Sequence, residues 1–175
     1  MEGITGGAFC AVLSRLGYVR CWVTPFIRVS TGVARPARLG RRLEPYLETG
    51  LPVIAQVLGT DAGRLAETAA RLAALGAAGV DLNCGCPSRT VVASGAGGAC
   101  LRRPEWIAET LRGMRRACPQ VGISVKVRTG LADPAEMREI LPAVLAGEPD
   151  LVTVHFRTVA ERSEERRVGK ECRSR

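Results

Sequence analysis

The chain has 175 residues, a length that suits one domain with a buried core. Hydrophobic residues make up 46% of it but aromatic residues only 4%, so its core must be built from Ala, Leu, Val and Ile. The net charge of +8 permits an anionic partner such as nucleic acid without requiring one. No apolar run approaches the roughly 20 residues of a membrane span, and there is no secretory leader and no CxxC pair. We therefore expect a cytoplasmic protein with free thiols and no membrane association.

Apolar strands alternate with amphipathic helices along the chain. We expect helices at residues 7–17, 43–47, 61–76, from 104 and from 133, and strands at residues 19–26, 52–59, 79–84, 123–127 and 151–156. Residues 28–42 are expected to form a basic loop, Asp61 to cap a helix, and Pro142 to interrupt the last helix. This alternation indicates an α/β fold with parallel strands. A (β/α)8 barrel and an open doubly wound sheet both fit, although no GxGxxG motif supports the second.

Residues 162–175 differ from the rest of the chain in composition. They contain no Leu, Ile or Ala and cannot bury an apolar face. The string resembles a translated sequencing adapter, so we expect a disordered, non-native tail. The amino end enters a turn without a preceding strand, and we expect a fragment at both ends.

The stretch that most strongly suggests chemistry covers residues 80–101. A buried strand is followed there by an amide, two thiols, a proline and a cluster of small residues, as parallel α/β proteins present reactive groups at the carboxyl ends of strands. Cys86 stands between Gly85 and Pro87, at a sharp exit from the strand, whereas Cys84 is expected to pack in the core. With the reference thiol pKa of about 8.5, a cysteine can serve as a proton donor or as a nucleophile. One histidine and a C-x-C pair do not make a zinc site, so we expect no metal.

Two residue types occur once in the chain before residue 162. Lys126 is the only lysine of that part and His155 the only histidine, and both are expected near the carboxyl ends of apolar strands. A buried charge there is costly unless a ligand pairs with it, and an ammonium can titrate where a guanidinium cannot. Gln56 supports the same reasoning with a neutral amide. The alternatives are a surface lysine, a core histidine and an edge-strand glutamine.

Several motifs follow one another in a fixed order. They are Met-Glu-Gly-Ile-Thr from residue 1, Gln-Val-Leu-Gly from residue 56, Val-Asp-Leu-Asn-Cys-Gly-Cys-Pro-Ser-Arg-Thr-Val from residue 80, Ser-Gly-Ala-Gly-Gly-Ala from residue 94, Ser-Val-Lys-Val-Arg-Thr-Gly from residue 124 and His-Phe-Arg-Thr from residue 155. Together they resemble the tRNA-dihydrouridine synthases. The Asn-Cys-Gly-Cys-Pro-Ser form resembles the class that acts on uridine 16 of bacterial tRNA.

This resemblance implies an FMN-dependent (β/α)8 TIM barrel followed by a C-terminal helical domain, with NADPH as the reductant and tRNA as the substrate. It implies that Cys86 protonates a uracil ring that takes a hydride from the reduced flavin. The residues that it assigns to FMN are Met1, Glu2, Gln56, Lys126 and His155. Asn83 is expected beside the uracil and Arg28 against the tRNA. We expect a monomer.

On the same basis, residues 1–161 are expected to form a partial barrel with a clipped first strand, without strands seven and eight and without the helical domain. Such a segment exposes sheet edges and apolar faces, so we expect poor stability and little or no activity from this chain alone. Two alternatives remain open. One is an FMN barrel acting on free pyrimidines, and the other is a non-catalytic RNA-binding remnant.

Overall fold

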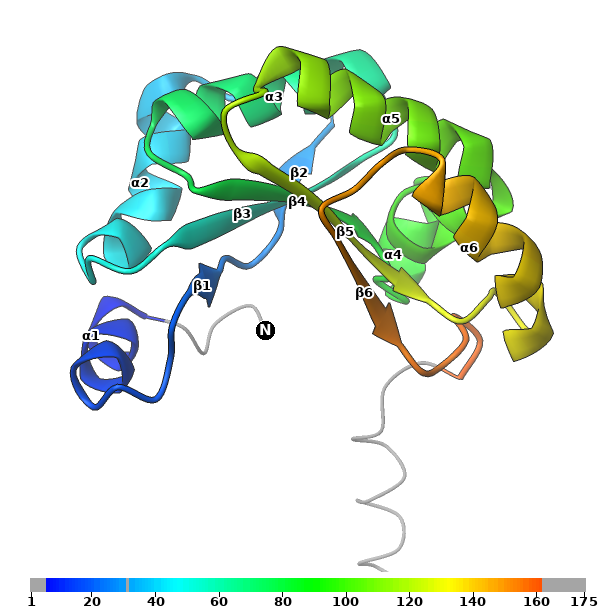
Figure 1. Ribbon diagram of the computed structural model, residues 1–175, viewed down its shortest axis with the longest axis horizontal. Coiled ribbons are helices and arrows are strands. Elements are labelled where there is room, and N and C mark those ends of the chain that lie inside the picture. The colour runs from blue at the N-terminus through cyan, green and yellow to red at the C-terminus, as the bar shows by residue number, and fades with distance from the viewer. Residues whose placement is uncertain (1–5, 31, 162–175) are drawn as a thin grey trace, which may run out of the picture.

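The computed structural model describes residues 6–30 and 32–161. Its helices are α1 (Gly7–Arg15), α2 (Pro36–Leu47), α3 (Ala62–Ala74), α4 (Arg89–Ala93), α5 (Pro104–Ala117) and α6 (Met137–Leu145), with two 3₁₀ helices, η1 (Gly97–Arg102) and η2 (Pro134–Glu136). Its strands are β1 (Trp22–Val23), β2 (Ile27–Val29), β3 (Val53–Gly59), β4 (Gly79–Cys84), β5 (Gly122–Arg128) and β6 (Leu151–His155). Strands and helices alternate over most of this order, as the sequence predicts (Figure 1).

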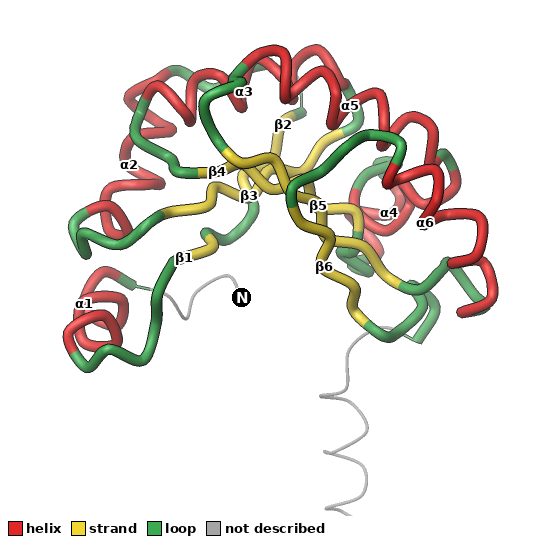
Figure 2. The backbone as a smooth tube through the Cα atoms, in the orientation of Figure 1, coloured by secondary structure: helices red, strands yellow, loops and turns green. Residues whose placement is uncertain are grey.

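All six strands belong to one parallel sheet. Its order is β1-β3-β4-β5-β6, and β2 also pairs with β3, further along that strand than β1 does. Helices α2, α3, α5 and α6 arch over one face of the curved sheet, whereas its concave face carries no helical layer from the described residues (Figures 1 and 2). The sheet is therefore a partial barrel, and the predicted α/β TIM-barrel class is confirmed.

Strands β4 and β5 turn an apolar side to the helices and a polar side to the hollow of the sheet. In β4 the side chains of Val80, Leu82 and Cys84 are fully buried in the aliphatic core between sheet and helices. The residues between them, Asp81 and Asn83, line the concave side. Because successive side chains of a strand point to opposite faces, this period of two places polar groups in the hollow without disturbing the core.

The amino-terminal third departs from the prediction in two places. The expected strand at residues 19–26 is split into β1 and β2 around Pro25, because a proline has no N–H to donate to a sheet. The expected basic loop at residues 28–42 ends early, because helix α2 begins at Pro36 rather than at residue 43. Proline is favourable at the first helical position, and Leu39 and Leu43 place a buried stripe on one face of this helix.

One further prediction was wrong in detail, because Pro142 lies inside α6 without interrupting it. The glycine-rich stretch after β4 holds helices α4 and η1. The expected start of helix α3 is confirmed, since the Asp61 side chain accepts a hydrogen bond from the backbone N–H of Arg64 at 2.9 Å. Among the described residues, no helix combines the length and the apolarity that crossing a membrane requires.

Candidate functional site

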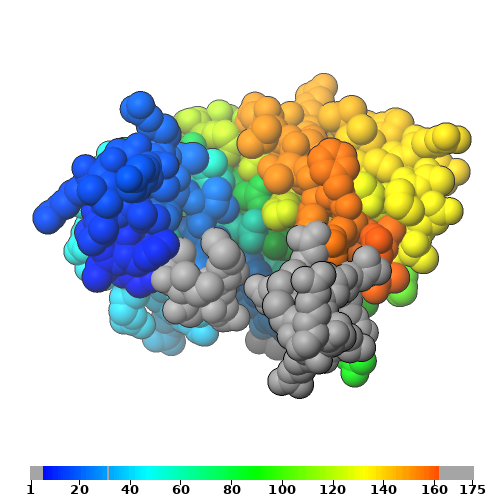
Figure 3. All heavy atoms as spheres, turned by 90° about the horizontal axis from the view of Figure 1, so that it is seen from below, coloured from blue at the N-terminus to red at the C-terminus, as the bar shows by residue number. Residues whose placement is uncertain are grey.

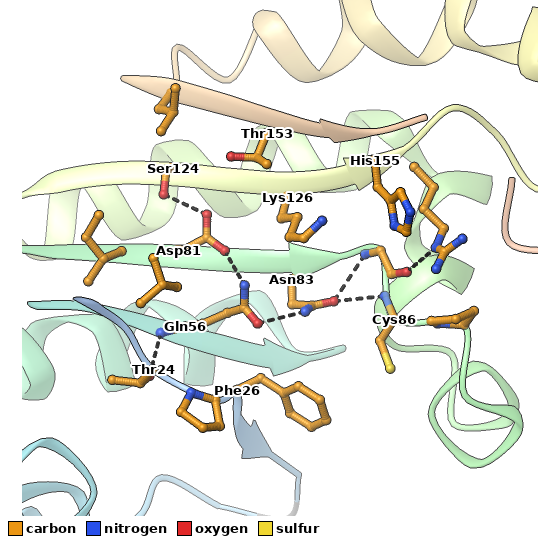
Figure 4. A pocket seen from close by; sticks show the side chains of 17 residues that line it. Thr24, Phe26, Gln56, Asp81, Asn83, Cys86, Ser124, Lys126, Thr153 and His155 are labelled. Carbon is orange, nitrogen blue, oxygen red and sulfur yellow. Dashed lines mark hydrogen bonds between the residues drawn. The ribbon is translucent and has the colours of Figure 1, made fainter. Parts of the chain in front are cut away.

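A cleft of about 590 Å³ opens on the concave face of the sheet. Figure 3 looks onto this face, which is hollowed between the amino-terminal segment and β6. Polar side chains from four neighbouring strands reach into the cleft (Figure 4), namely Gln56, Asp81, Asn83, Ser124, Lys126, Arg128, Thr153 and His155. Apolar side chains complete its walls, namely Val23, Pro25, Phe26, Ile54 and Leu151.

Strand register arranges the polar side chains in rows across the sheet. Gln56, Asp81 and Ser124 are paired neighbours on β3, β4 and β5 and form one row across the sheet. Asn83 pairs with Lys126 one step nearer the carboxyl edge. Parallel strands that share a register place their carboxyl ends together, so these rows lead toward the loop that follows β4.

Cys86 lies two residues beyond the end of β4, half-buried at the mouth of the cleft. Its peptide unit is held on both sides. The backbone N–H of Cys86 donates to Asn83 Oδ1 at 3.0 Å, and the N–H of Gly98 donates to the Cys86 carbonyl oxygen at 3.0 Å. Cys84, by contrast, is buried in the core, where a hydrogen bond with Cys100 and burial raise the pKa of Cys84 well above its ordinary value. The site thus offers the cleft one thiol, that of Cys86.

A chain of hydrogen bonds runs along the floor of the cleft to this loop (Figure 4). Asp81 accepts a bond from Ser124 Oγ at 2.6 Å and one from Gln56 Nε2 at 2.8 Å. Gln56 Oε1 accepts from Asn83 Nδ2 at 2.8 Å. Asn83 Oδ1 then accepts from the backbone N–H groups of Gly85 and Cys86. Burial is the main reason that the pKa of Asp81 is raised, and the bonds from Ser124 and Gln56 oppose that shift.

Lys126 brings a partly buried ammonium into the cleft. Burial lowers its pKa, the nearby Arg128 guanidinium lowers it further, and Asp81 acts in the opposite direction. Within residues 6–30 and 32–161, Lys126 Nζ makes no hydrogen bond and no ion pair. A desolvated cation without a partner is unfavourable, so an electron-rich group of a ligand would find a strong donor here.

Arg128 and His155 are paired neighbours on β5 and β6, at the carboxyl edge of the cleft. The Arg128 guanidinium is only 3% exposed and donates to the carbonyl oxygens of Gly85 at 2.7 Å and of Thr158 at 2.9 Å. It therefore ties the Cys86 loop to the segment that follows β6. His155 lines the cleft beside it, with Thr153 on the same side of the strand.

The structure brings most of the predicted site residues together, but not all of them. Five line the one cleft, namely Gln56, Asn83, Cys86, Lys126 and His155. Arg28 lies on β2 with its side chain exposed and lines a separate groove of about 710 Å³ between β2, residues 30 and 32–35, and α2. Met1 and Glu2 lie outside the described residues.

The sequence-based reasoning missed Asp81, Ser124 and Arg128. The sequence holds a signal for them. Asp81 is two residues from Asn83 in β4, and Ser124 and Arg128 are each two residues from Lys126 in β5, so these residues share a face of their strand. A period of two in the polar residues of both strands would have identified the whole inward face.

Comparison with known protein families gives one match that covers nearly the whole chain. A family model described as "Dihydrouridine synthase (Dus)" matches residues 1–169.

Several curated relatives are more than a third identical to this chain over the aligned residues. The tRNA-dihydrouridine(16) synthase of Vibrio cholerae is 38% identical over 167 residues, which are 91% of this chain and 51% of the relative. The protein of the same name from Haemophilus influenzae is 39% identical over 92% of this chain and 54% of its own length. That from Escherichia coli K12 is 40% identical over 90% and 52%. The chain thus spans about half the length of these relatives.

A solved structure supports the fold. A Coccidioides immitis protein described as a deoxyribose-phosphate aldolase superposes with a TM-score of 0.55 at 17% identity, covering 89% of this chain and 56% of the other. At that identity the similarity concerns the architecture alone.

Proposed function

The chain belongs to the dihydrouridine synthase family, and on this premise we propose that its cleft takes part in reducing a uridine of tRNA to 5,6-dihydrouridine with FMN as the bound cofactor. NADPH is the reductant in this proposal. The uridine is number 16, the position in the printed names of the relatives from Vibrio cholerae and Escherichia coli. Because the chain spans about half the length of these relatives, we propose this activity for a catalytic unit of which this chain is one part.

One observation carries the proposal most directly. The half-buried thiol of Cys86, the amide of Asn83 and the ammonium of Lys126 all face one cleft with apolar walls. A thiol is a suitable proton donor, and an amide and an ammonium are suitable partners for ring carbonyl groups. This donor set fits the reduction of a planar, carbonyl-bearing ring.

The residues present fit a flavin ring. Gln56, Lys126 and His155 would hold it, with Met1 and Glu2 as further proposed contacts outside the described part of the chain. Lys126 would meet an electron-rich edge of the ring, which satisfies its partly desolvated ammonium. The walls formed by Val23, Pro25, Phe26, Ile54 and Leu151 offer apolar surface to a flat aromatic system. When bound and reduced, FMN supplies the hydride that the uracil receives at C6.

Side chains of this chain then orient the uracil and supply the proton. Asn83 orients the uracil by donating its free amide N–H to a ring carbonyl oxygen. Cys86 gives the proton from its thiol to C5, so that the C5–C6 double bond becomes a single bond and the sulfur is left as a thiolate. Solvent returns the proton to Cys86 before the next cycle. The base must leave its stack to reach the cleft, as in other enzymes that modify a nucleobase.

The groove that contains Arg28 supports an RNA substrate. It is lined by five exposed arginines, namely Arg28, Arg35, Arg38, Arg41 and Arg42. None of the five forms an ion pair with a residue in the described parts of the chain. The backbone beside them is braced by Arg64, which donates to Ser30 O at 2.7 Å, and by Arg71, which donates to Ala34 O at 3.0 Å. We infer that the five arginines bind phosphates of the tRNA next to the flipped uridine.

The proposal extends to the isolated chain, which we expect to bind FMN weakly. Strand β6 is an edge of the described sheet, with Leu151 56% exposed and Phe156, just beyond it, 87% exposed. An open edge with exposed apolar side chains leaves one side of the cleft to solvent. Titration of the 175-residue chain with FMN, followed by flavin fluorescence, is expected to give no tight stoichiometric binding.

A chimera tests the catalytic proposal. Residues 7–161 replace the matching half of the Escherichia coli relative, and the chimera is expressed in a strain that lacks this relative. Dihydrouridine at position 16 of the tRNA is then measured by mass spectrometry. We expect it to be restored, and to be lost again in the Cys86→Ala chimera while bound flavin is retained.

Two results of this experiment would count against the proposal. Undiminished dihydrouridine in the Cys86→Ala chimera would exclude the thiol as the proton donor. A flavin-loaded chimera that reduces free uracil but leaves tRNA unchanged would favour a reductase of free pyrimidines instead.

A further inference from the structure

The hydrogen-bonded chain on the floor of the cleft has defined chemistry at both of its ends. At one end stands the Asp81 carboxylate, which in its ionised form only accepts hydrogen bonds. At the other end stand the backbone N–H groups of Gly85 and Cys86, which only donate. Between them lie the amides of Gln56 and Asn83, whose oxygen and nitrogen ends could each point either way.

The two ends permit one arrangement of both amides. Gln56 must offer Nε2 to the carboxylate, so it offers Oε1 to Asn83. Asn83 must offer Oδ1 to the backbone donors, so it offers Nδ2 to Gln56. Any single reversal places two donors or two acceptors face to face inside a buried network, where Gln56, Asp81 and Asn83 are each less than a tenth exposed.

We propose that Asp81 is a positioning residue, which acts through Gln56 and Asn83 to hold the Cys86 loop and to leave Asn83 as a pure hydrogen-bond donor toward the cleft. Both acceptor positions of Asn83 Oδ1 are engaged by the loop, at 3.1 Å from Gly85 N and 3.0 Å from Cys86 N. Only the second N–H of its Nδ2 is left for a ligand. The ligand atom that meets Asn83 is therefore an acceptor, such as the carbonyl oxygen of a uracil.

Asp81 is buried, and burial disfavours its charged form. The hydrogen bonds that the carboxylate accepts from Ser124 and Gln56 offset this cost. Removing the carboxylate would leave both of these donors buried without an acceptor. The catalytic significance of this relay rests on the proposed role of Cys86, whereas the relay itself does not.

The test compares two substitutions in the 175-residue chain. Asp81→Leu removes the acceptor, and Asp81→Asn removes the charge but keeps an oxygen for Gln56, because the Ser124 hydroxyl can rotate and accept from the new amide. The measured quantity is the hydrogen exchange rate of the Gly85 and Cys86 backbone amides. The control is internal, since the Gly98 amide donates to the Cys86 carbonyl oxygen and reports whether the loop stays packed.

We expect exchange at Gly85 and Cys86 to rise roughly threefold to tenfold in Asp81→Leu and to stay within about twofold in Asp81→Asn. A second readout is the alkylation rate of each cysteine. In Asp81→Leu the alkylation rate of Cys86 should change, while that of the exposed Cys21 should stay the same. General destabilisation would alter both cysteines and both variants. Exchange that is unchanged in a folded Asp81→Leu chain, or raised equally in Asp81→Asn, would overturn the proposal.

A second variant covers the case in which Asp81→Leu does not fold. Gln56→Met keeps Asp81 and Ser124 and removes only the middle link, and the relay then requires faster exchange at Gly85 and Cys86 as well. Unchanged exchange there overturns the relay on its own. This outcome is separate from that of the chimera. If the relay is confirmed and the Cys86→Ala chimera is active, the proposed catalytic role of Cys86 is excluded but the relay is not.

Discussion

The backbone N–H of Gly98 donates a hydrogen bond of 3.0 Å to the carbonyl oxygen of Cys86. The two residues are far apart in sequence, and the contact is possible because the glycine-rich stretch folds back through α4 and η1 onto the end of β4. Gly97, next to it, has a φ of +58°. A Cβ at Gly97 would lie 2.9 Å from the Cys86 carbonyl oxygen and 3.0 Å from its Cβ. The glycines thus allow a second segment of backbone to touch the loop that carries the thiol.

Gly97→Ala is expected to displace this loop and to destabilise the chain by roughly 1–3 kcal/mol, because a left-handed backbone and a close backbone contact are both incompatible with a Cβ. Denaturant unfolding measures the change. Gly40→Ala in α2 is the matched control, since nothing lies within 4 Å of the added Cβ, and there we expect a gain of about 0.5–1 kcal/mol. Equal effects at the two glycines would contradict this account of the loop.

Lys126→Met is expected to raise the stability of the chain at neutral pH. Burial and Arg128 lower the pKa of Lys126 from its ordinary value of 10.5, so the unfolded chain holds this proton more tightly than the folded one. The resulting cost is present below the folded pKa and fades as the pH rises toward 10.5 and above. The melting temperature of the variant should be higher by roughly 2–4 °C at pH 7, and the gain should shrink at high pH. A drop at pH 7 would show that Lys126 stabilises the fold.

Glu136→Gln is expected to cost roughly 1–2 kcal/mol at neutral pH. The Glu136 carboxylate accepts hydrogen bonds from the backbone N–H groups of Leu131 at 2.9 Å, Ala132 at 3.0 Å and Asp133 at 2.8 Å, which lower its pKa from 4.5. An amide has only one oxygen, so it cannot accept on both sides. The wild-type advantage should be full above pH 4.5 and disappear as the pH falls through the lowered folded pKa.

Urea unfolding at several pH values measures this difference. Glu139→Gln is the control, because Glu139 is acidic and exposed and lies in the first turn of α6, shortly after Glu136. Its variant should differ from wild type by less than about 0.5 kcal/mol across the range. A Glu136→Gln deficit that persisted unchanged at acid pH would exclude the carboxylate as its source.

The double variant Arg38→Gln with Arg41→Gln is expected to weaken binding of unmodified tRNA and to flatten its salt dependence. Each phosphate contact that is lost should reduce the slope of log K against log salt by about 0.7–0.9. The control carries Arg116→Gln with Arg138→Gln, which removes the same charge from exposed positions on α5 and α6. Fluorescence anisotropy at several salt concentrations gives both slopes. Equal slopes in the two double variants would show that the arginines of the groove act only through the net charge of the protein.

Asn83→Asp is expected to lose uridine reduction in the chimera. An aspartate still accepts from the Gly85 and Cys86 amides, but it has no N–H for a ring carbonyl or for Gln56. Dihydrouridine formation should therefore fall by roughly 100-fold or more. Because the link to Gln56 is lost, amide exchange at Gly85 and Cys86 should rise as it does in Gln56→Met. Retained activity in this variant would remove Asn83 from substrate binding.

Much of this protein could be inferred from its sequence because periodicity and motif order are local properties. The alternation of apolar strands with amphipathic helices determined the α/β class, and the motifs around Cys86, Lys126 and His155 determined the family, which the comparisons confirm. The roles assigned to these residues stay predictions. Helix α2 begins earlier than the sequence predicts, because Leu39 and Leu43 form a buried stripe on one face of a segment that is otherwise rich in arginine.

Tertiary structure alone decided which polar groups meet. Strand register placed Asp81 beside both Gln56 and Ser124, and it placed Arg28 outside the cleft in a groove with the arginines of α2. Hydrogen bonds between side chains depend on distances of about 3 Å between atoms that are distant in sequence, and no local pattern encodes those distances. The chain sequence specified the donors and acceptors, and the pairing of the strands selected the partners of each.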